Sequence, residues 1–142
     1  MALKKTQLLP ITTVVGVQTV GIYTAGLTAT SVGVGTTSYV KSIIMHNAGA
    51  AANHAGLGTA RVGVYIYPNT GVTDRVSGVG NSSYRILQID LAPNETSFFE
   101  SNYPLVLAPF NAIAVDVKQP DVGGAGVGTA VNFIINGDTE TP

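Results

Sequence analysis

Residues 84–118 read YRILQIDLAPNETSFFESNYPLVLAPFNAIAVDVK, and they contain three short apolar runs separated by turn residues. Pro93-Asn94-Glu95 follows the first run, and Pro109 precedes the last. Apolar side chains occupy every second position of the outer runs: Leu87, Ile89 and Leu91, then Ile113, Val115 and Val117. A period of two residues indicates strands with one face buried. The stretch therefore predicts consecutive antiparallel strands.

The remainder of the chain repeats this pattern. We expect further strands at 20–24, 39–47, 60–67 and 130–135, joined by loops rich in Gly, Ser, Thr and Asn. In the second of these, simple alternation predicts one face with Val40 and Ile44 and another with Tyr39, Ile43 and Met45. No stretch has helical spacing. About eight strands in 142 residues predict an all-β fold: a single antiparallel β-sandwich, jelly-roll-like.

The two ends of the chain are expected to lie outside this domain. Pro10 restricts the first segment to an edge strand or an extended arm, and we predict an extended N-terminal arm over residues 1–17. Lys4-Lys5 and the apolar residues after them have the outline of a signal peptide, but Pro10 and later polar residues interrupt it. The β-sandwich domain is expected at 18–137, and 138–142 as a short, exposed, acidic tail.

Composition narrows the function classes. Charged residues make up 11% of the chain, against about 25% in typical soluble domains. The formal net charge is −1, without clusters of cations, which argues against a nucleic-acid partner. No apolar run is long enough for a membrane-spanning helix, so we expect no membrane partner. The absence of cysteine rules out disulfides and zinc–cysteine sites. A weakly charged surface is typical of proteins in permanent contact with other protein.

Residues that could carry chemistry are few and scattered. His46 and His54 are too few for a metal site, which normally needs three or four ligands. Nothing in the spacing brings together any two of the acids Asp90, Glu95, Glu100 and Asp116. The glycine-rich run 123–128 leads into a strand, whereas phosphate-binding loops lead into a helix. We therefore expect no catalytic residue, no metal and no cofactor, and a protein that is not an enzyme.

One group of residues is typical of a binding surface. Arg61, Tyr65 and Tyr67 fall on one face of the predicted strand 60–67. Tyrosine and arginine are frequent in protein interfaces. Two interpretations stay open: a second sheet or a partner subunit covers these side chains, or they form a platform for a glycan.

The order of strands and turns resembles that of small β-sandwich structural proteins of tailed bacteriophages. The residues that carry the resemblance are VKSIIMHN (40–47), ARVGVYIYPN (60–69), RILQIDLAPNETSFFE (85–100) and YPLVLAPFNAIAVDV (103–117). They span about the last hundred residues of the chain.

The resemblance implies a virion component assembled in the host cytoplasm. Its most direct form is a head decoration or cement protein that contacts the major capsid protein and copies of itself, for example as a homotrimer. The alternative is a tail, collar or fibre component with the capacity to bind glycans. In either case the predicted arm could add a strand to a neighbouring sheet. The expected interface residues are Leu8, Leu9, Ile11, Arg61, Tyr65 and Tyr67.

Overall fold

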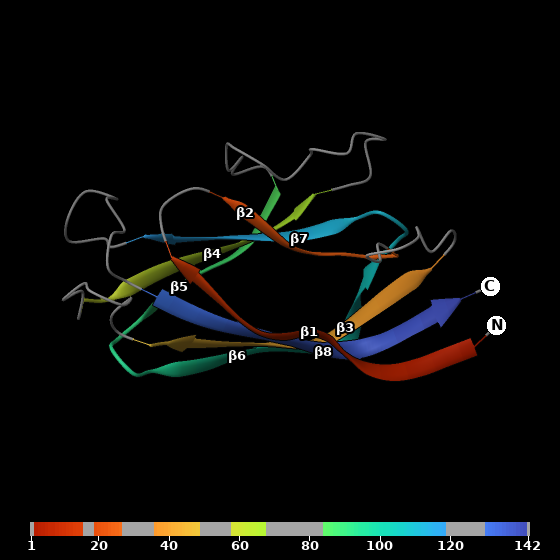
Figure 1. Cartoon of the computed structure of the whole chain (residues 1–142), viewed down its shortest axis with the longest axis horizontal. Coiled ribbons are helices and arrows are strands. Elements are labelled where there is room, and N and C mark those ends of the chain that lie inside the picture. The colour runs from red at the N-terminus through yellow and green to blue at the C-terminus, as the bar shows by residue number, and fades with distance from the viewer. Residues whose placement is uncertain are drawn as a thin grey trace.

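The computed structural model describes residues 2–15, 19–26, 36–48, 58–67, 84–118 and 130–141. Figure 1 shows the strands in two stacked layers, with both ends of the chain at the same end of the molecule. The prediction of an all-β sandwich is confirmed. The strands are β1 (Ala2–Val15), β2 (Val20–Thr24), β3 (Thr37–Asn47), β4 (Ala60–Tyr67), β5 (Arg85–Leu91), β6 (Thr96–Leu107), β7 (Ala112–Lys118) and β8 (Ala130–Thr141).

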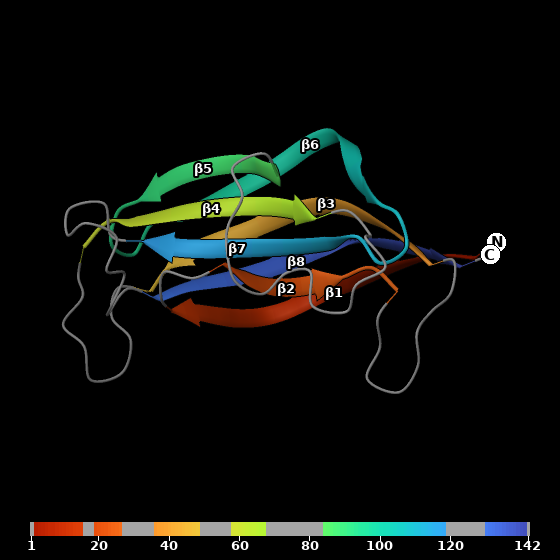
Figure 2. The same ribbon diagram turned by 90° about the horizontal axis from the view of Figure 1, so that it is seen from above.

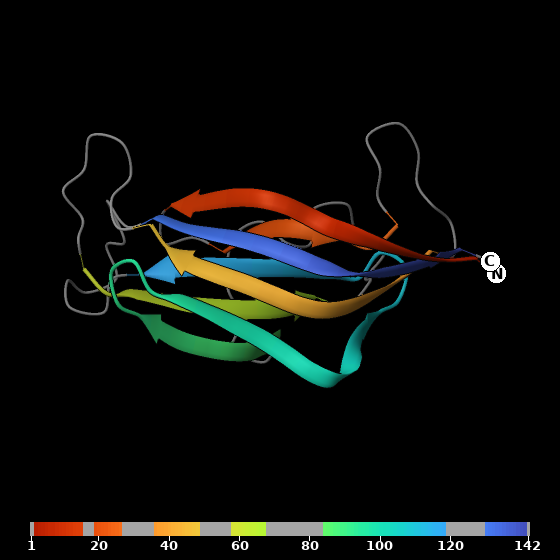
Figure 3. The same cartoon turned by 90° about the horizontal axis from the view of Figure 1, so that it is seen from below.

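The strands form two four-stranded sheets in the order of a jelly roll. One sheet has the order β1-β8-β3-β6 and the other β2-β7-β4-β5, and all neighbouring strands are antiparallel. We call the first the β8 sheet and the second the β7 sheet. Figure 2 views the β7 sheet from outside, and Figure 3 views the β8 sheet from outside. Within the described residues, eight strands that alternate between two sheets in this order make the double Greek key of jelly rolls.

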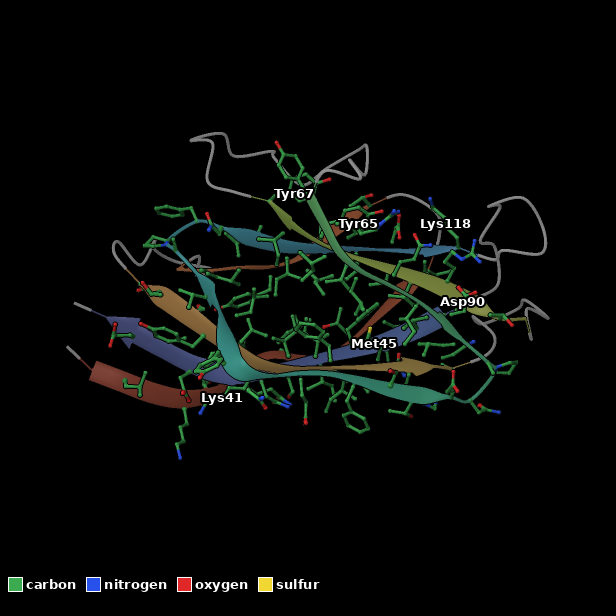
Figure 4. The ribbon with its side chains drawn as sticks, turned by 180° about the vertical axis from the view of Figure 1, so that it is seen from behind. Lys41, Met45, Tyr65, Tyr67, Asp90 and Lys118 are labelled. Atoms are coloured by element: carbon green, nitrogen blue, oxygen red, sulfur yellow. The ribbon has the colours of Figure 1, made fainter. Side chains whose placement is uncertain are left out.

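The core lies between the two sheets. Figure 4 shows Met45 pointing from β3 into this space. Burial of the core side chains stabilises the fold by roughly 25 cal/mol per Å² of apolar area removed from water. The largest fully buried side chains are Val40, Ile43, Met45, Leu107, Phe133 and Ile135 of the β8 sheet, and Val62, Val64, Leu91, Ile113, Val115 and Val117 of the β7 sheet.

A β-bulge in β3 makes the predicted faces of this strand wrong. Val40 pairs with Gly137 of β8 and Ser42 with Asn136, so Lys41 is an extra residue between two successive pairs. An extra residue reverses the alternation beyond it. Val40, Ile43 and Met45 are therefore all buried, while Ile44 is only half-buried.

The predicted N-terminal arm is instead an edge strand of the sandwich. Residues 2–15 pair along their length with β8 of the same chain. Pro10 lies within a register shift between Leu9 and Thr12, where an edge strand tolerates a residue without an N–H. Of the two interpretations of Pro10, an edge strand or an extended arm, the edge strand is correct, because β1 lies at the edge of its sheet. Leu8, Leu9 and Val14 of this strand also pack on the core.

The predicted C-terminal tail is also part of a strand. β8 continues to Thr141 and pairs with β1 on one side and β3 on the other. Asp138, expected to be exposed, is only 6% exposed. Asn136-Gly137 resembles a hairpin turn, but Gly137 is needed for another reason. A Cβ at this position would collide with the backbone carbonyl of Tyr39 on β3, so the glycine permits close approach of two strands.

Asn47 joins the two sheets at one end of the sandwich. Its buried side-chain amide donates hydrogen bonds to the carbonyls of Leu91 (3.0 Å) and Gly58 (3.2 Å). Its backbone N–H donates to Glu95 O, and its carbonyl accepts from Asn94 N, each at 2.9 Å. Asn94 has the positive φ of 63° that this turn requires.

Candidate functional site

The predicted interface residues do not form one surface. Leu8, Leu9 and Ile11 lie on β1, whereas Arg61, Tyr65 and Tyr67 lie on β4 of the opposite sheet. Leu8 and Leu9 are half-buried against the core. Ile11 is 66% exposed, so of the three β1 residues it is the one most available to a partner.

The outer face of the β7 sheet holds a buried hydrogen-bonded cluster around Asp116. The hydroxyl of Tyr65 donates to Asp116 Oδ2 at 2.8 Å, and the backbone N–H of Gly63 donates to Oδ1 at 3.0 Å. Lys118 Nζ lies 3.7 Å from Oδ2. A buried carboxylate is stable only when it is compensated in this way. The hydrogen bonds of the cluster link Asp116 of β7 to the neighbouring strand β4.

Tyr65 has a strongly altered pKa in this cluster. Burial is the main cause, followed by the hydrogen bond and the negative charge of Asp116, and together they raise the pKa of Tyr65 to about 12. The nearby Arg85 guanidinium acts in the opposite direction. Tyr65 therefore stays a neutral hydrogen-bond donor over the physiological range and is poorly suited to act as a base.

Arg61 and Asp90 form an ion pair beside this cluster. Arg61 Nε lies 2.8 Å from Asp90 Oδ1, and Nη2 lies 3.1 Å from Oδ2. The pair joins β4 to β5, where Arg61 and Asp90 are direct neighbours. The hydrogen bond from Arg61 lowers the pKa of Asp90. Figure 4 shows Asp90, Lys118 and Tyr65 on this side of the molecule.

Of the two interpretations of Arg61, Tyr65 and Tyr67, the glycan platform lacks exposed tyrosine rings. Tyr65 and Tyr67 are 3% and 8% exposed within the chain itself. The ring of Tyr67 packs against Tyr65, with centroids 6.3 Å apart, and against Tyr84 at 5.0 Å. These contacts leave little ring face for a sugar. Arg61 is partly exposed, and its place in an interface stays a prediction.

Glu95 and His46 have structural partners, and Glu100 is exposed on β6. Glu95 Oε1 accepts a hydrogen bond from Ala92 N in the turn after β5 (3.0 Å). His46 Nδ1 and Thr96 Oγ1 form a hydrogen bond of 2.7 Å between β3 and β6. Asp90 and Asp116 lie on the same sheet, but β4 separates them and each faces its own cation. His54 and the glycine-rich run 123–128 lie outside the described residues.

A groove crosses the outer side of the β8 sheet near the chain ends. Its volume is about 320 Å³, and it is lined by Leu3, Tyr39, Lys41, Pro104, Asp138 and Glu140. Lys41 Nζ lies 3.0 Å from Asp138 Oδ2. The Tyr39 hydroxyl donates to Glu140 Oε1 at 3.0 Å, and this bond raises the pKa of Tyr39. The groove is therefore lined both by apolar side chains and by charged side chains that already have partners.

Sequence reasoning missed the groove because two of its acids were assigned to an exposed tail. Gly137 is a local sign that the strand continues into this region, but a glycine in this position is also typical of a turn. Lys41 belongs to the bulge of β3, and a bulge has no sequence signature in this strand.

The β8 sheet also exposes large apolar side chains on its outer side and edges. Figure 3 shows that, among the strands that the structure describes, no other lies in front of this sheet. The exposed residues are Leu3 (62%), Ile11 (66%) and Val15 (45%) on β1, and Phe98 (60%), Tyr103 (83%) and Val106 (55%) on β6. Tyr103 lies where β6 leaves its partner: Val40 pairs with Leu105 and Ser42 with Glu100. We call residues 101–104, where the pairing with β3 is interrupted, the elbow of β6.

In the part of the chain that the structure describes, no three His, Cys, Asp or Glu residues are grouped closely enough to hold a metal ion. Within the same residues, no helix has the length and apolar character needed to cross a membrane. No protein-family model matches the chain, and no curated protein matches its sequence.

Proposed function

We propose that this chain is a virion structural protein without enzymatic activity: a decoration or cement protein that stabilises a bacteriophage head. It would contact the major capsid protein and copies of itself. The observation that carries the proposal is the outer side of the β8 sheet, where large apolar side chains are exposed on a molecule with few charges. Such surfaces mark protein contacts.

The fold supports the same function class. Jelly rolls occur in viral capsid proteins, and also in lectins and cupins. Since one fold serves many functions, the strand order supports the proposal only together with the surface. Lectin-type binding through Arg61, Tyr65 and Tyr67 is disfavoured by the burial of both rings.

The elbow of β6 is the part of this surface best placed to contact the shell. Tyr103 and Val106 project from β6, and Leu3 projects from β1 near the groove. An exposed tyrosine beside a groove offers the aromatic anchor that dominates many interfaces. Weak contacts of this kind gain strength by repetition over a symmetric shell.

The test is binding of the purified chain to empty heads of the phage that encodes it, prepared without this protein. The chain should sediment with the heads and raise the temperature at which they disassemble. A Tyr103→Ser/Val106→Ser variant should bind markedly less. A matched variant on the other sheet, Ile86→Ser, should bind as the wild type does, because Ile86 is exposed on β5.

Electron microscopy of virions with the labelled protein separates the two positions on the particle. Label distributed over the head supports a decoration protein. Label confined to the tail, collar or fibres, together with no binding to heads, would contradict the proposal and favour the alternative.

A further inference from the structure

The outer face of the β8 sheet carries a row of apolar side chains that crosses all four strands. Phe98 of β6 pairs with Ile44 of β3, and Ile44 pairs with Ile134 of β8. The register shift between Leu9 and Thr12 leaves Pro10 and Ile11 of β1 beside Ile134, and the exposed Ile11 continues the row. We call Phe98, Ile44, Ile134 and Ile11 the apolar row. Its two ends are 60% and 66% exposed.

Two polar rows flank the apolar row. On β3, β6 and β8 each polar row lies two residues from it, whereas on β1 the register shifts place Thr13 two residues and Gln7 four residues from Ile11. On one side, His46 is paired with Thr96 and Asn132, and Asn132 with Thr13. We call these four residues the histidine row. Hydrogen bonds link His46 to Thr96 (2.7 Å) and Thr13 to Asn132 (2.6 Å). These polar groups already have partners within the face, which lowers the cost of covering them.

The row on the other side contains the one acid of the three rows. Ser42 is paired with Glu100 and Asn136, and Asn136 with Gln7. We call these four residues the glutamate row. Apart from Glu100 and the titratable His46, the three rows are uncharged. Covering the three rows would therefore bury few charges. The charges of the groove at the other end of the face already have partners: Lys41 pairs with Asp138, and Glu140 accepts a hydrogen bond from Tyr39.

This arrangement is self-complementary under a two-fold axis that runs along the apolar row. Rotation about that axis stacks the apolar row on its own copy. It also sets the histidine row of each chain against the glutamate row of the other, with Glu100 facing Thr96 and next to His46. We propose that the outer face of the β8 sheet binds a second copy of the chain, face to face, in an isologous dimer.

The area of the face is sufficient for such a dimer. Eleven residues of β3 at about 3.3 Å per residue and four strands at about 4.8 Å give roughly 35 Å by 19 Å, or about 700 Å² per copy. Stable interfaces bury about 800 Å² per partner. The dimer rests on the proposed function and deepens it: it assigns this whole face to a second copy and leaves the elbow of β6, where that strand is not paired with β3, for the shell.

The isolated protein provides the test, so failure of the dimer and failure of head binding are separate results. Analytical ultracentrifugation over a concentration series should show a monomer–dimer equilibrium. Phe98→Glu places like charges together at the axis and should weaken the dimer at least roughly thirtyfold, as loss of a central interface side chain does. Ile86→Glu, an equally charged change on β5 of the other sheet, should leave the dissociation constant unchanged. Circular dichroism and thermal melts check that both variants are folded.

A charge exchange tests the placement of the two-fold axis. Thr96→Glu should weaken the dimer, because the new acid faces Glu100 of the second copy. Adding Glu100→Lys to the same chain should restore it, since both faces then pair opposite charges. The proposal is overturned if the wild type is a monomer at every concentration. It is also overturned by a trimer or any other oligomer that Phe98→Glu does not affect, or by a double variant as weak as Thr96→Glu alone.

Discussion

Gly137 shows how a single residue can decide the pairing of two strands. It lies within β8, and a Cβ at this position would collide with the Tyr39 carbonyl and approach Leu8 Cδ1 to 3.1 Å. The obstacle is backbone, which cannot rotate away as a side chain can. The glycine is thus required for the close approach of β8 to β3.

Gly137→Ala should therefore destabilise the fold by about 3 kcal/mol or more, in the upper range for overpacking. Urea unfolding measures the change. Gly21→Ala on edge strand β2 is the control, because Gly21 is exposed, and it should change stability by less than about 1 kcal/mol. Equal stability of the Gly137→Ala protein and the wild type would show that β3 and β8 can separate locally without cost.

Tyr65 links stability to alkaline pH. Its pKa is about 12 in the folded chain against 10.0 for a free tyrosine. The contribution of Tyr65 is complete below pH 10. As the pH rises from 10 to 12, the unfolded chain loses this proton while the folded chain keeps it, so stability falls over that interval.

Tyr65→Phe should flatten this alkaline decline and, at neutral pH, lower stability by about 1–3 kcal/mol, because Asp116 loses a hydrogen bond. Denaturant unfolding at several pH values measures both effects. Tyr103→Phe, at an 83% exposed position, should leave stability at neutral pH unchanged. An alkaline decline as steep in Tyr65→Phe as in the wild type would show that Tyr65 does not cause it.

At the scale of elements, β1 differs most from its sequence prediction. This 14-residue strand lies at the edge of its sheet and pairs with β8. Its residue Val14 is buried. The amino-acid pattern of this segment is loosely periodic, since Pro10 and a register shift interrupt it. Its identity as a strand comes from the partner strand, which is more than a hundred residues away in the sequence.

Deletion of residues 2–15 should destabilise the sandwich itself, because it exposes core side chains and the edge of β8. We expect little soluble protein and loss of the cooperative unfolding transition. Circular dichroism during thermal unfolding measures this transition. Ile11→Ser is the control, and it should fold normally because Ile11 is 66% exposed. A truncated chain that kept a cooperative transition would restore the interpretation of this segment as an arm.

At the scale of the whole molecule, the outer sides of the two sheets expose apolar side chains to different degrees. On the β7 sheet, Tyr65, Tyr67, Ala114 and Asp116 are buried, and Val20 and Ile86 of its edge strands are 43% exposed. On the β8 sheet, Ile11 and Phe98 are 66% and 60% exposed, and Figure 3 shows none of the described strands in front of this side. The head-binding and dimerisation experiments both examine this asymmetry, because their variants on the β8 sheet are matched to Ile86 on the other sheet.

The sequence by itself determined the class of the fold. The alternation in 85–91 and 112–118, the turn residues between strands and the rarity of charge are local properties, so they predict β-strands, a sandwich and a protein-contact surface without knowledge of partners. The inward residues of β4, Val62 and Val64, were also predictable, because no bulge interrupts that part of the strand.

Only the tertiary structure decided which strands pair and in which register. The bulge at Lys41, the continuation of β8 through Gly137 and the pairing of β1 all depend on backbone hydrogen bonds between distant segments. The same holds for the candidate surfaces. On the β7 sheet, Tyr65 and Tyr67 are buried, and on the β8 sheet, Phe98, Ile44, Ile134 and Ile11 form a row only because four strands align. Periodicity describes one strand at a time, whereas a binding face is a property of several strands in register.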